Sequence, residues 1–476
     1  MKTKKRTSLV VGACAVSIMA VLPAVSVSAS TPQTLNVMVG NSEFEKGQFA
    51  YNEVQAFMKA NPDIHVNLQY VNVNWNNAFS ALAASKQLPD VFQPPAGGSL
   101  QQMLANHWVK SLNTKYFLAN PNFPKGSFQP GVNMSGGQVY SFPYEFKGGV
   151  LMEYNKGLMK QAGLNPANPP KTWAQLYSMS KQIAKKVPGK FGLVWPLNGA
   201  IGYSYLMDFV TAMIPTTNAG GFNYKTGAYE DGSPQVRQAV EFMINMAKSG
   251  GLDPNSVNDS LAQTLGAFAN GQDAFIPVGI WGPENQDLQY GGGKNYGVTS
   301  LPVPKAGEKP YSLVSPAGTS FWISSTTKHY QAALKFVDWF TTRQFFATQL
   351  NKGELLPPNA LQLLKKGYKF PTPQLQEEAQ TYSRTTIYAP NINASPGAAL
   401  VNQILSLLPP LSPQQWQIVD GAVGGHDSQW QSQLQKVAVL RRQQLAQAIV
   451  KAQKTGAKVS LRDFQFPTWN GLSNYK

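Results

Sequence analysis

A strand, a stiff proline-rich link and a capped helix follow one another within residues 148–176 of this 476-residue chain. The apolar run 150–154 has the character of a short buried strand. A short helix is expected over 157–162 and ends at Gly163, because glycine tolerates the left-handed C-terminal cap. Pro169-Pro170 cannot continue a helix and holds the chain extended.

Thr172 then begins a new helix, with Gln175 three residues later in a Thr-x-x-Gln capping box. The order predicts a strand that leaves one body, a link that spans a gap, and a helix that starts a second body. A chain of this length, 43% hydrophobic and only 13% charged, can bury a large core and favours at least two domains.

The N-terminus has the pattern of a secretory signal peptide. Basic residues at 2–6 precede an apolar run over 9–25 and small residues at 26–30, so we expect a signal peptide over 1–30, cleaved near Ala29 or Ser30. A second interpretation makes Cys14, the single cysteine of the chain, a lipidated first residue, since Val-Gly-Ala-Cys resembles the lipoprotein cleavage box. Only about five apolar residues precede Cys14, which favours the cleaved peptide. Either way, the exported body has no disulfide.

The chain is basic, with 40 Lys plus Arg against 24 Asp plus Glu and a formal net charge of +16. Four of these positive charges lie in the signal segment, so the exported part carries +12. The remaining cations are spread along the chain and are not interleaved with aromatic residues, so no nucleic-acid partner is expected. We hypothesise instead that the scarcity of carboxylates suits an acidic medium.

Strands alternate with helices in the first part of the exported chain. Strands are expected at 35–39, 64–70 and 88–92. A helix from residue 49 to Asn61-Pro62 and another at 76–85 are expected between them. This alternation predicts a parallel or mixed α/β sheet. In such sheets ligands lie beyond the carboxyl ends of the strands. The loops that follow the first and third strands are therefore candidate binding loops.

The same alternation continues after the link. We expect helices at 173–187, 203–214, 234–249 and 260–269, strands at 274–278, 298–303 and 321–324, and a helical end over 429–454. Three segments, near residues 144, 311–315 and 353–358, are expected to cross between the two bodies. Three crossings between two α/β lobes predict a hinged clamshell, since closure needs dihedral changes only at the crossings.

Several of these segments together resemble the extracellular solute-binding proteins of ABC importers, a family whose best-known member binds maltose. The resemblance rests on Tyr154-Asn155-Lys156, on Pro169-Pro170-Lys171-Thr172-Trp173, on the first-lobe runs Asn61–Val66 and Leu88–Phe92, and on Gly279-Ile280-Trp281. It implies a periplasmic-binding-protein type II-like α/β fold, with two lobes joined by a hinge and a ligand cleft between them. The first lobe is expected to comprise 31–144 plus 315–355, and the second 145–314 plus 356–476 with a helical C-terminal part.

Catalytic signatures are missing from the sequence. No Gly-x-Ser-x-Gly, His-Glu-x-x-His or phosphate-loop pattern occurs. Glu145 and Glu153 are eight residues apart, and on one extended strand they would lie too far apart for a glycosidase pair. The four histidines are not spaced as metal ligands. We therefore expect no catalytic residue, no metal and no cofactor.

Binding of a sugar would use flat aromatic rings and hydrogen-bonding side chains. The resemblance places Trp281 under a sugar ring and Gly279 beside it; the alternative is an indole buried in the second lobe. It also places Trp195 at the second-lobe rim, with Tyr203 nearby. From the first lobe, Asn41 and Glu43 follow the first strand and Gln93 follows the third.

Three more candidates come from later segments. Glu145 lies where relatives carry a ligand-binding acid between the lobes, and Tyr388 and Asn391 lie in a second-lobe loop expected to close over the ligand. Gln93-Pro94-Pro95 replaces the aromatic and acidic residues that are frequent in relatives, which argues against a maltodextrin ligand.

These features predict the substrate-binding component of an ABC importer that captures a carbohydrate, a di- or oligosaccharide, and delivers it to the transmembrane subunits of a permease. We expect a monomer on the extracellular side of the membrane, which it meets only through the permease or a lipid anchor. The alternatives are a secreted carbohydrate-active enzyme, or a receptor for a non-sugar solute such as a glycerol phosphate.

Overall fold

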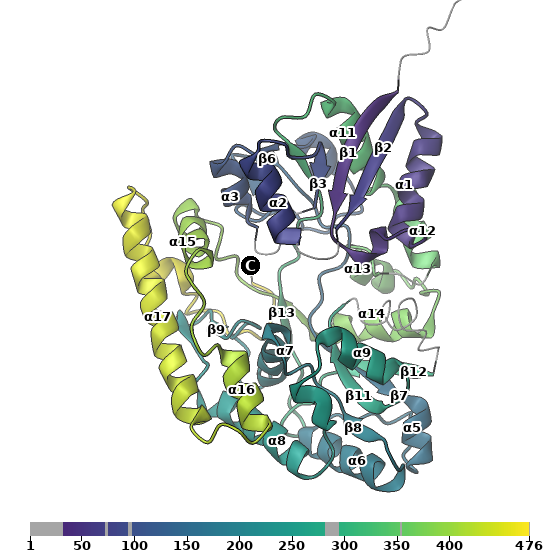
Figure 1. The fold of residues 1–476 in the computed structure, drawn as a ribbon, viewed down its shortest axis with the longest axis vertical. Helices are drawn as coiled ribbons and strands as arrows, with labels where there is room; N and C mark the ends of the chain where they lie inside the picture. The colour runs from purple at the N-terminus through teal and green to yellow at the C-terminus, as the bar shows by residue number, and fades with distance from the viewer. Residues whose placement is uncertain (1–31, 72–74, 94–97, 281–294, 353–354, 476) are drawn as a thin grey trace, which may run out of the picture.

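Two β-sheets, each covered by helices, lie in separate parts of the computed structural model of this protein (Figure 1). The structure describes residues 32–71, 75–93, 98–280, 295–352 and 355–475. The strand order is β2-β1-β3-β14-β4 in the first sheet and β12-β7-β11-β8 in the second. The α/β character predicted from the sequence is confirmed.

The first sheet consists of β1 (Gln33–Val39), β2 (Ile64–Tyr70), β3 (Val91–Phe92), β4 (Val109–Lys110) and β14 (Trp322–Ser324). Strand β1 runs parallel to both β2 and β3, with Val37 opposite Leu68 on one side and Val91 on the other. Strand β14 returns antiparallel to β3 and β4. Because the three parallel strands end at one edge, the loops after β1 and β3 lie together there.

Helices cover both faces of this sheet. They are α1 (Phe49–Ala60), α2 (Trp75–Ala84), α3 (Leu100–Ala105), α4 (Thr114–Ala119), α11 (Tyr330–Trp339) and α12 (Arg343–Asn351). Side chains alternate between the faces of a strand. Val37 therefore packs in one apolar cluster with α1 and α11, and Met38 in another with α2 and α3.

The second sheet consists of β7 (Leu151–Asn155), β8 (Phe191–Leu193), β11 (Asp273–Val278) and β12 (Tyr296–Ser300). Strand β7 is antiparallel to β11 and β12, and β8 is parallel to β11. The strand expected at 298–303 starts earlier and ends at Ser300. The reason is that Val303 forms backbone hydrogen bonds with Lys171 and Trp173 instead of continuing the ladder.

Its helices are α5 (Lys156–Gln161), α6 (Trp173–Lys186), α7 (Ala200–Val210), α8 (Pro234–Lys248), α9 (Leu261–Ala269), α13 (Ala360–Lys365) and α14 (Pro373–Thr385). The capping box of Thr172 and Gln175 is present at the start of α6, and Gly163 has φ +75° after α5. Helix α7 begins before the expected residue 203, because Gly199 precedes it and offers no capping side chain as a sequence signal.

The C-terminal region adds α15 (Pro396–Ser406), α16 (Gln415–Val423) and α17 (Trp430–Lys454). Helix α17 packs against both α15 and α16. Helix α16 lies on α7 and α8, and α17 lies beside the hairpin of β9 (Phe222–Asn223) and β10 (Ala228–Tyr229) (Figure 1). This region therefore attaches mainly to the helices that cover the second sheet. Helix α15 also contacts α3, one of the helices that cover the first sheet.

The segments between the two bodies pair with one another. Strand β13 (Ser312–Val314) runs parallel to β15 (Thr386–Tyr388), and we call this pair the β13–β15 ribbon. The backbone N–H of Phe146 donates to the carbonyl of Leu356, which joins the segment near residue 144 to the one at 355–358. The pairing of β13 with β15 was not predicted, because its partners are far apart in the sequence.

Candidate functional site

The loops at the carboxyl ends of β1 and β3 meet at the edge of the first sheet. Gln93 follows β3 and is only 3% exposed. Its Oε1 accepts hydrogen bonds from the backbone N–H groups of Gly40 (2.8 Å) and Asn41 (3.1 Å). Gln93 therefore holds the loop after β1 in place, and the side-chain oxygen predicted for a ligand is already committed to the backbone.

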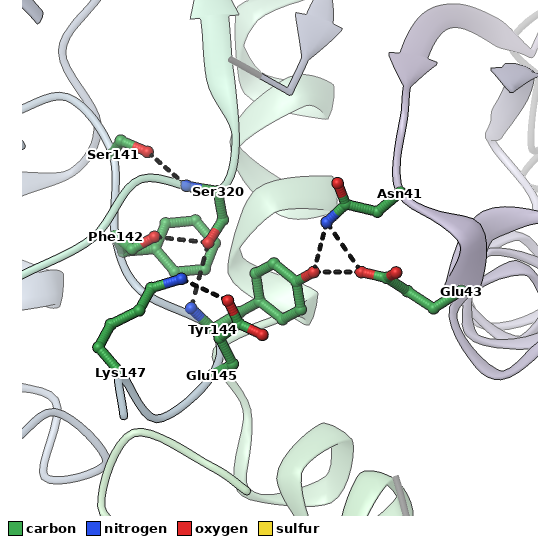
Figure 2. Close-up of polar contacts among 8 residues, drawn as sticks. All are labelled: Asn41, Glu43, Ser141, Phe142, Tyr144, Glu145, Lys147 and Ser320. Atoms are coloured by element: carbon green, nitrogen blue, oxygen red, sulfur yellow. Dashed lines mark hydrogen bonds and ion pairs between the residues drawn. The ribbon is translucent and has the colours of Figure 1, made fainter. Parts of the chain in front are cut away.

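Asn41, Glu43 and Tyr144 form a hydrogen-bonded cluster at this edge (Figure 2). Asn41 Nδ2 donates to the Tyr144 hydroxyl at 2.8 Å and to Glu43 Oε1 at 3.0 Å. The Tyr144 hydroxyl in turn donates to Glu43 Oε1. The structure thus brings together two predicted residues, Asn41 and Glu43, with Tyr144, which was not predicted as a binding residue.

Burial governs the protonation of this cluster. It raises the pKa of Glu43 above its ordinary value, although Tyr144 and Asn41 donate hydrogen bonds that oppose the shift. Burial also holds the pKa of the Tyr144 hydroxyl well above its ordinary value, and the charges of Glu43 and Glu145 raise it further. Tyr144 therefore stays a hydroxyl donor, and the three side chains are held as one arrangement.

Two serines fix the chain beside this cluster. Ser141 Oγ donates to Phe321 O at 2.9 Å. Ser320 Oγ donates to Phe142 O at 2.7 Å, and the backbone N–H of Ser320 donates to Ser141 Oγ at 3.0 Å (Figure 2). The backbone N–H of Tyr144 donates to Ser320 Oγ at 3.1 Å. Because both serines are buried, these bonds fasten the segment at 141–144 to the one that returns at 320–321.

Glu145 lies next to the cluster and forms an ion pair with Lys147 (Figure 2). The Glu145 side chain is 17% exposed and that of Lys147 is 32% exposed. The predicted acid near residue 144 is therefore present at the boundary between the bodies, and its charge is balanced by a lysine two residues away.

Trp195 requires a correction. The indole is 0% exposed, packs edge-on against Phe209 and donates from Nε1 to Gly202 O at 3.0 Å. It lies inside the apolar core of the second body, so no face of the ring is open to a solute. The sequence pattern of a large aromatic at a strand end could not distinguish a rim from a core.

Tyr203 is a second correction. Its hydroxyl donates to Asp231 Oδ1 at 2.6 Å, and the Asp231 carboxylate also binds Arg441 at 2.9 Å. Burial and the charge of Asp231 hold the pKa of the Tyr203 hydroxyl well above its ordinary value. Tyr203 is thus part of a buried structural network that joins α7 to α17.

Gly279 directly follows β11, and its backbone N–H donates to the hydroxyl of Tyr205 at 3.1 Å. Burial raises the pKa of Tyr205, so the hydroxyl remains protonated while it accepts this bond. Trp281 lies outside the described residues, so its role remains a prediction. The Tyr205 hydroxyl therefore positions the backbone at the end of β11. The sequence offered no signal that would have selected Tyr205 instead of Tyr203.

Tyr388 is the last residue of β15, and Asn391 lies on the segment that follows the β13–β15 ribbon. The backbone of Tyr388 bonds to Asn474 Oδ1 and to the N–H of Tyr475, both at 2.8 Å, so the C-terminal end of the chain lies along β15. Asn391 Nδ2 donates to Pro130 O at 2.9 Å. In this conformation the Tyr388 backbone and the Asn391 side chain therefore bond to other parts of the protein.

Across the described ranges, no group of three or more His, Cys, Asp or Glu side chains is arranged to hold a metal ion. In the same part of the chain, no helix combines the length and the apolar character that crossing a bilayer requires.

Comparisons with curated proteins find distant relatives. The chain is 24% identical over 322 residues to the sn-glycerol-3-phosphate-binding periplasmic protein UgpB of Rhizobium meliloti, covering 64% of this chain and 67% of that protein. It is 25% identical over 326 residues to the UgpB protein of Salmonella typhimurium, covering 66% and 72%. The matches thus span about two thirds of the relatives' length.

Solved structures share the fold over most of the chain. A solute-binding protein of an ABC transporter from Thermotoga lettingae, bound with α-D-tagatose, superposes with a TM-score of 0.65 at 17% identity, covering 88% of this chain and all of that one. The sugar-binding protein MalE of Xanthomonas citri superposes with a TM-score of 0.58 at 20% identity, covering 90% and 100%. The α/β fold of periplasmic binding proteins is therefore established.

The model of the family described as bacterial extracellular solute-binding protein matches residues 41–344, which is more than half of the chain. This is a family of binding proteins and not of enzymes, and its description agrees with the predicted extracellular location. The protein therefore belongs to the bacterial extracellular solute-binding proteins.

Proposed function

We propose that this protein is the solute-binding component of an ABC importer and that it captures a carbohydrate between its two lobes. The observation that carries the proposal is the cluster of Asn41, Glu43 and Tyr144, preorganised at the carboxyl edge of the first sheet. Within the described residues, Glu43 Oε2 and Asn41 Oδ1 take part in no hydrogen bond of the cluster. Both are acceptors suited to sugar hydroxyls.

The charge at this edge favours a neutral polyol over a phosphate ester. Glu43 and Glu145 are acids, and Lys147 beside them is already paired with Glu145. A carboxylate accepts hydrogen bonds from hydroxyl groups but repels a phosphate. A glycerol phosphate remains the second candidate, because the curated relatives carry that ligand in their names.

Capture would proceed by closure about the crossing segments. The lobes 31–144 plus 315–355 and 145–314 plus 356–476 are proposed to move as two bodies, with the β13–β15 ribbon and residues 141–147 between them. A solute that binds the closed form more tightly shifts the population toward closure. The closed form would then dock on the permease.

A thermal-shift screen against mono-, di- and oligosaccharides, with glycerol 3-phosphate as a separate arm, tests this function. A ligand that binds only the native state stabilises it by about 2.7 kcal/mol at one hundred times its Kd. A shift with a sugar and none with the phosphate supports the proposal. A shift with glycerol 3-phosphate alone would replace the carbohydrate with the second candidate.

The same screen tests Trp281. We expect Trp281→Ala to abolish the shift for the best sugar, because the ring would lose its stacking contact. Trp416→Ala is the matched control, since Trp416 lies partly buried on α16 against the core of the second lobe. Each variant is compared with its own unliganded melting temperature, and an unaltered shift in Trp281→Ala would assign the indole a structural role.

A further inference from the structure

A pocket with a volume of about 860 Å³ opens on the second lobe, and its lining is separate from the candidate site. Its walls come from three segments: the link before α6, the chain from the end of β12 to Pro310, and the end of α14. None of the Asn41, Glu43 and Tyr144 side chains lines it. The volume lies in the range of small-molecule sites.

Three cations converge on this pocket, one from each wall: Lys171, Lys309 and Arg384. All three are exposed, and no ion pair within the described residues involves any of them. Three unpaired cations around one cavity repel one another, and an anion between them would relieve that repulsion.

Negative charge at the pocket is limited. Glu308 is the only acid in the described lining, and its Oε2 accepts a hydrogen bond from the backbone N–H of Lys305 at 3.1 Å. Asp208 lines a separate chamber of about 10 Å³ that shares Ser300, Val303 and other wall residues with the pocket. Burial raises the pKa of Asp208 to about 7, so this carboxyl carries little charge below that pH.

The remaining polar groups suit the oxygen atoms of an anion. Thr299 and Ser300 present hydroxyl groups at the end of β12, and Arg384 has a planar fork of donors that fits a phosphate. Thr172, which lines the pocket, is also the N-cap of α6, a 14-residue helix. The partial positive charge at the N-terminus of this helix makes the electrostatic potential in the pocket more positive.

The pocket lies at the base of the β13–β15 ribbon. Lys309 and Pro310 come just before β13, and Arg384 and Thr385 come just before β15. Ser312 and Thr386, the first residues of the two strands, are paired. An anion held by Lys309 and Arg384 would therefore join the second-lobe ends of both strands.

We propose that this pocket is a second binding site, separate from the solute site, for a small soluble phosphate-bearing anion. The proposal does not depend on the identity of the captured solute. It assigns Lys171, Lys309 and Arg384 as the residues that bind the anion.

Isothermal titration of the exported chain with inorganic pyrophosphate, at low ionic strength near pH 7, tests the proposal. The charge-removing variant is Lys309→Gln/Arg384→Gln, and we expect its affinity to fall at least about tenfold, since two charge-assisted contacts are lost. The matched control is Lys436→Gln/Arg442→Gln, which removes one lysine and one arginine from the exposed surface of α17 and should bind within about twofold of the unaltered protein.

A third variant separates the two sites. Glu43→Gln alters the candidate solute site, and we expect it to leave pyrophosphate binding unchanged. Four results would overturn the proposal: no binding by the unaltered protein, equal loss in both double variants, loss in Glu43→Gln but not in Lys309→Gln/Arg384→Gln, or binding to phosphatidylglycerol vesicles without binding to pyrophosphate. Sugar binding is measured on the same samples, so failure of the solute site is seen independently.

Discussion

Asn391 Nδ2 donates a hydrogen bond to the backbone carbonyl of Pro130, 2.9 Å away, and so ties the segment after β15 to the first lobe. Gly131 also packs tightly against Asn393. A Cβ atom added to Gly131 would lie only 1.9 Å from the carbonyl oxygen of Asn393. Residues 391–393 therefore contact residues 130–131, although the sequence predicts the two segments to lie in different lobes. If the lobes move, this contact must either open or move with the first lobe.

Gly131→Ala should destabilise the protein by more than Gly136→Ala. Both glycines have positive φ, +78° and +54°, so both substitutions carry the backbone strain of an L-residue. Only at Gly131 would the new methyl group overlap the Asn393 backbone, whereas nothing lies within 4 Å at Gly136. We expect an additional loss of about 1–3 kcal/mol in the free energy of unfolding, measured with urea. Equal losses of unfolding free energy in the two variants would mean that the Asn393 backbone shifts to accommodate the methyl group at little cost.

Tyr144→Phe should weaken solute binding by about tenfold without unfolding the protein. The substitution removes the hydroxyl that accepts from Asn41 and donates to Glu43, so both side chains lose a fixed position. Titration calorimetry with the best ligand of the screen measures the change. Tyr140→Phe is the control, because the Tyr140 hydroxyl takes part in no hydrogen bond with the described residues. A weakening of the same size in both variants would argue against a role of the cluster in binding.

Stability should fall as pH rises from about 4 to about 8. Asp273 is 0% exposed, and burial together with the neighbouring charge of Asp253 raises its pKa to about 8, whereas an unfolded Asp titrates near 3.9. A group whose pKa is higher in the folded state contributes stability that is complete below the unfolded pKa. That contribution is lost as pH rises through the folded value.

Asp273→Asn should remove part of this pH dependence, because the amide does not ionise. The free energy of unfolding, measured with urea between pH 4 and 9, should decline less in the variant by at least about 2 kcal/mol. Asp63→Asn is the control, since Asp63 is exposed and only 3.8 Å from Lys335 in a surface pair. A stability maximum near pH 8 in the unaltered protein would refute both this prediction and the acidic-medium hypothesis.

Arg441→Met should be strongly destabilising and Arg442→Met nearly neutral. Arg441 is the cation that pairs with Asp231, whose side chain is 0% exposed, and its guanidinium also lies 3.9 Å from the centroid of the Tyr229 ring. Removing one partner of a buried pair costs about 3–5 kcal/mol. Arg442 is exposed, so its loss should cost less than about 0.5 kcal/mol. Thermal unfolding and urea titration measure both.

The same network predicts the behaviour of Tyr203→Phe. The loss of the hydroxyl that donates to Asp231 should lower the free energy of unfolding by about 1–3 kcal/mol. The affinity for the solute should stay within about twofold, because Tyr203 lies in the structural network. A tenfold loss of affinity with unchanged stability would return Tyr203 to the binding site.

Local rules explain why most elements were predictable. Thr172 caps the helix that starts at Trp173, and Gly163 ends the one before it, because capping depends on residues three or four apart. The alternation of Leu35, Val37 and Val39 gave β1 for the same reason, since side chains alternate along a strand. Where a local signal was missing, as at Gly199, the predicted boundary was displaced.

The sequence by itself determined the α/β alternation, the capped helix that follows the proline-rich link, and the family to which the chain belongs. Only the tertiary structure decided which polar side chains meet. Asn41 and Tyr144 are 103 positions apart and share a hydrogen bond. Trp195 and Tyr203, which were candidates by residue type, instead donate hydrogen bonds to Gly202 and Asp231. Helices and strands follow from neighbours a few residues away, but the partner of a buried polar group is set by the packing of distant segments.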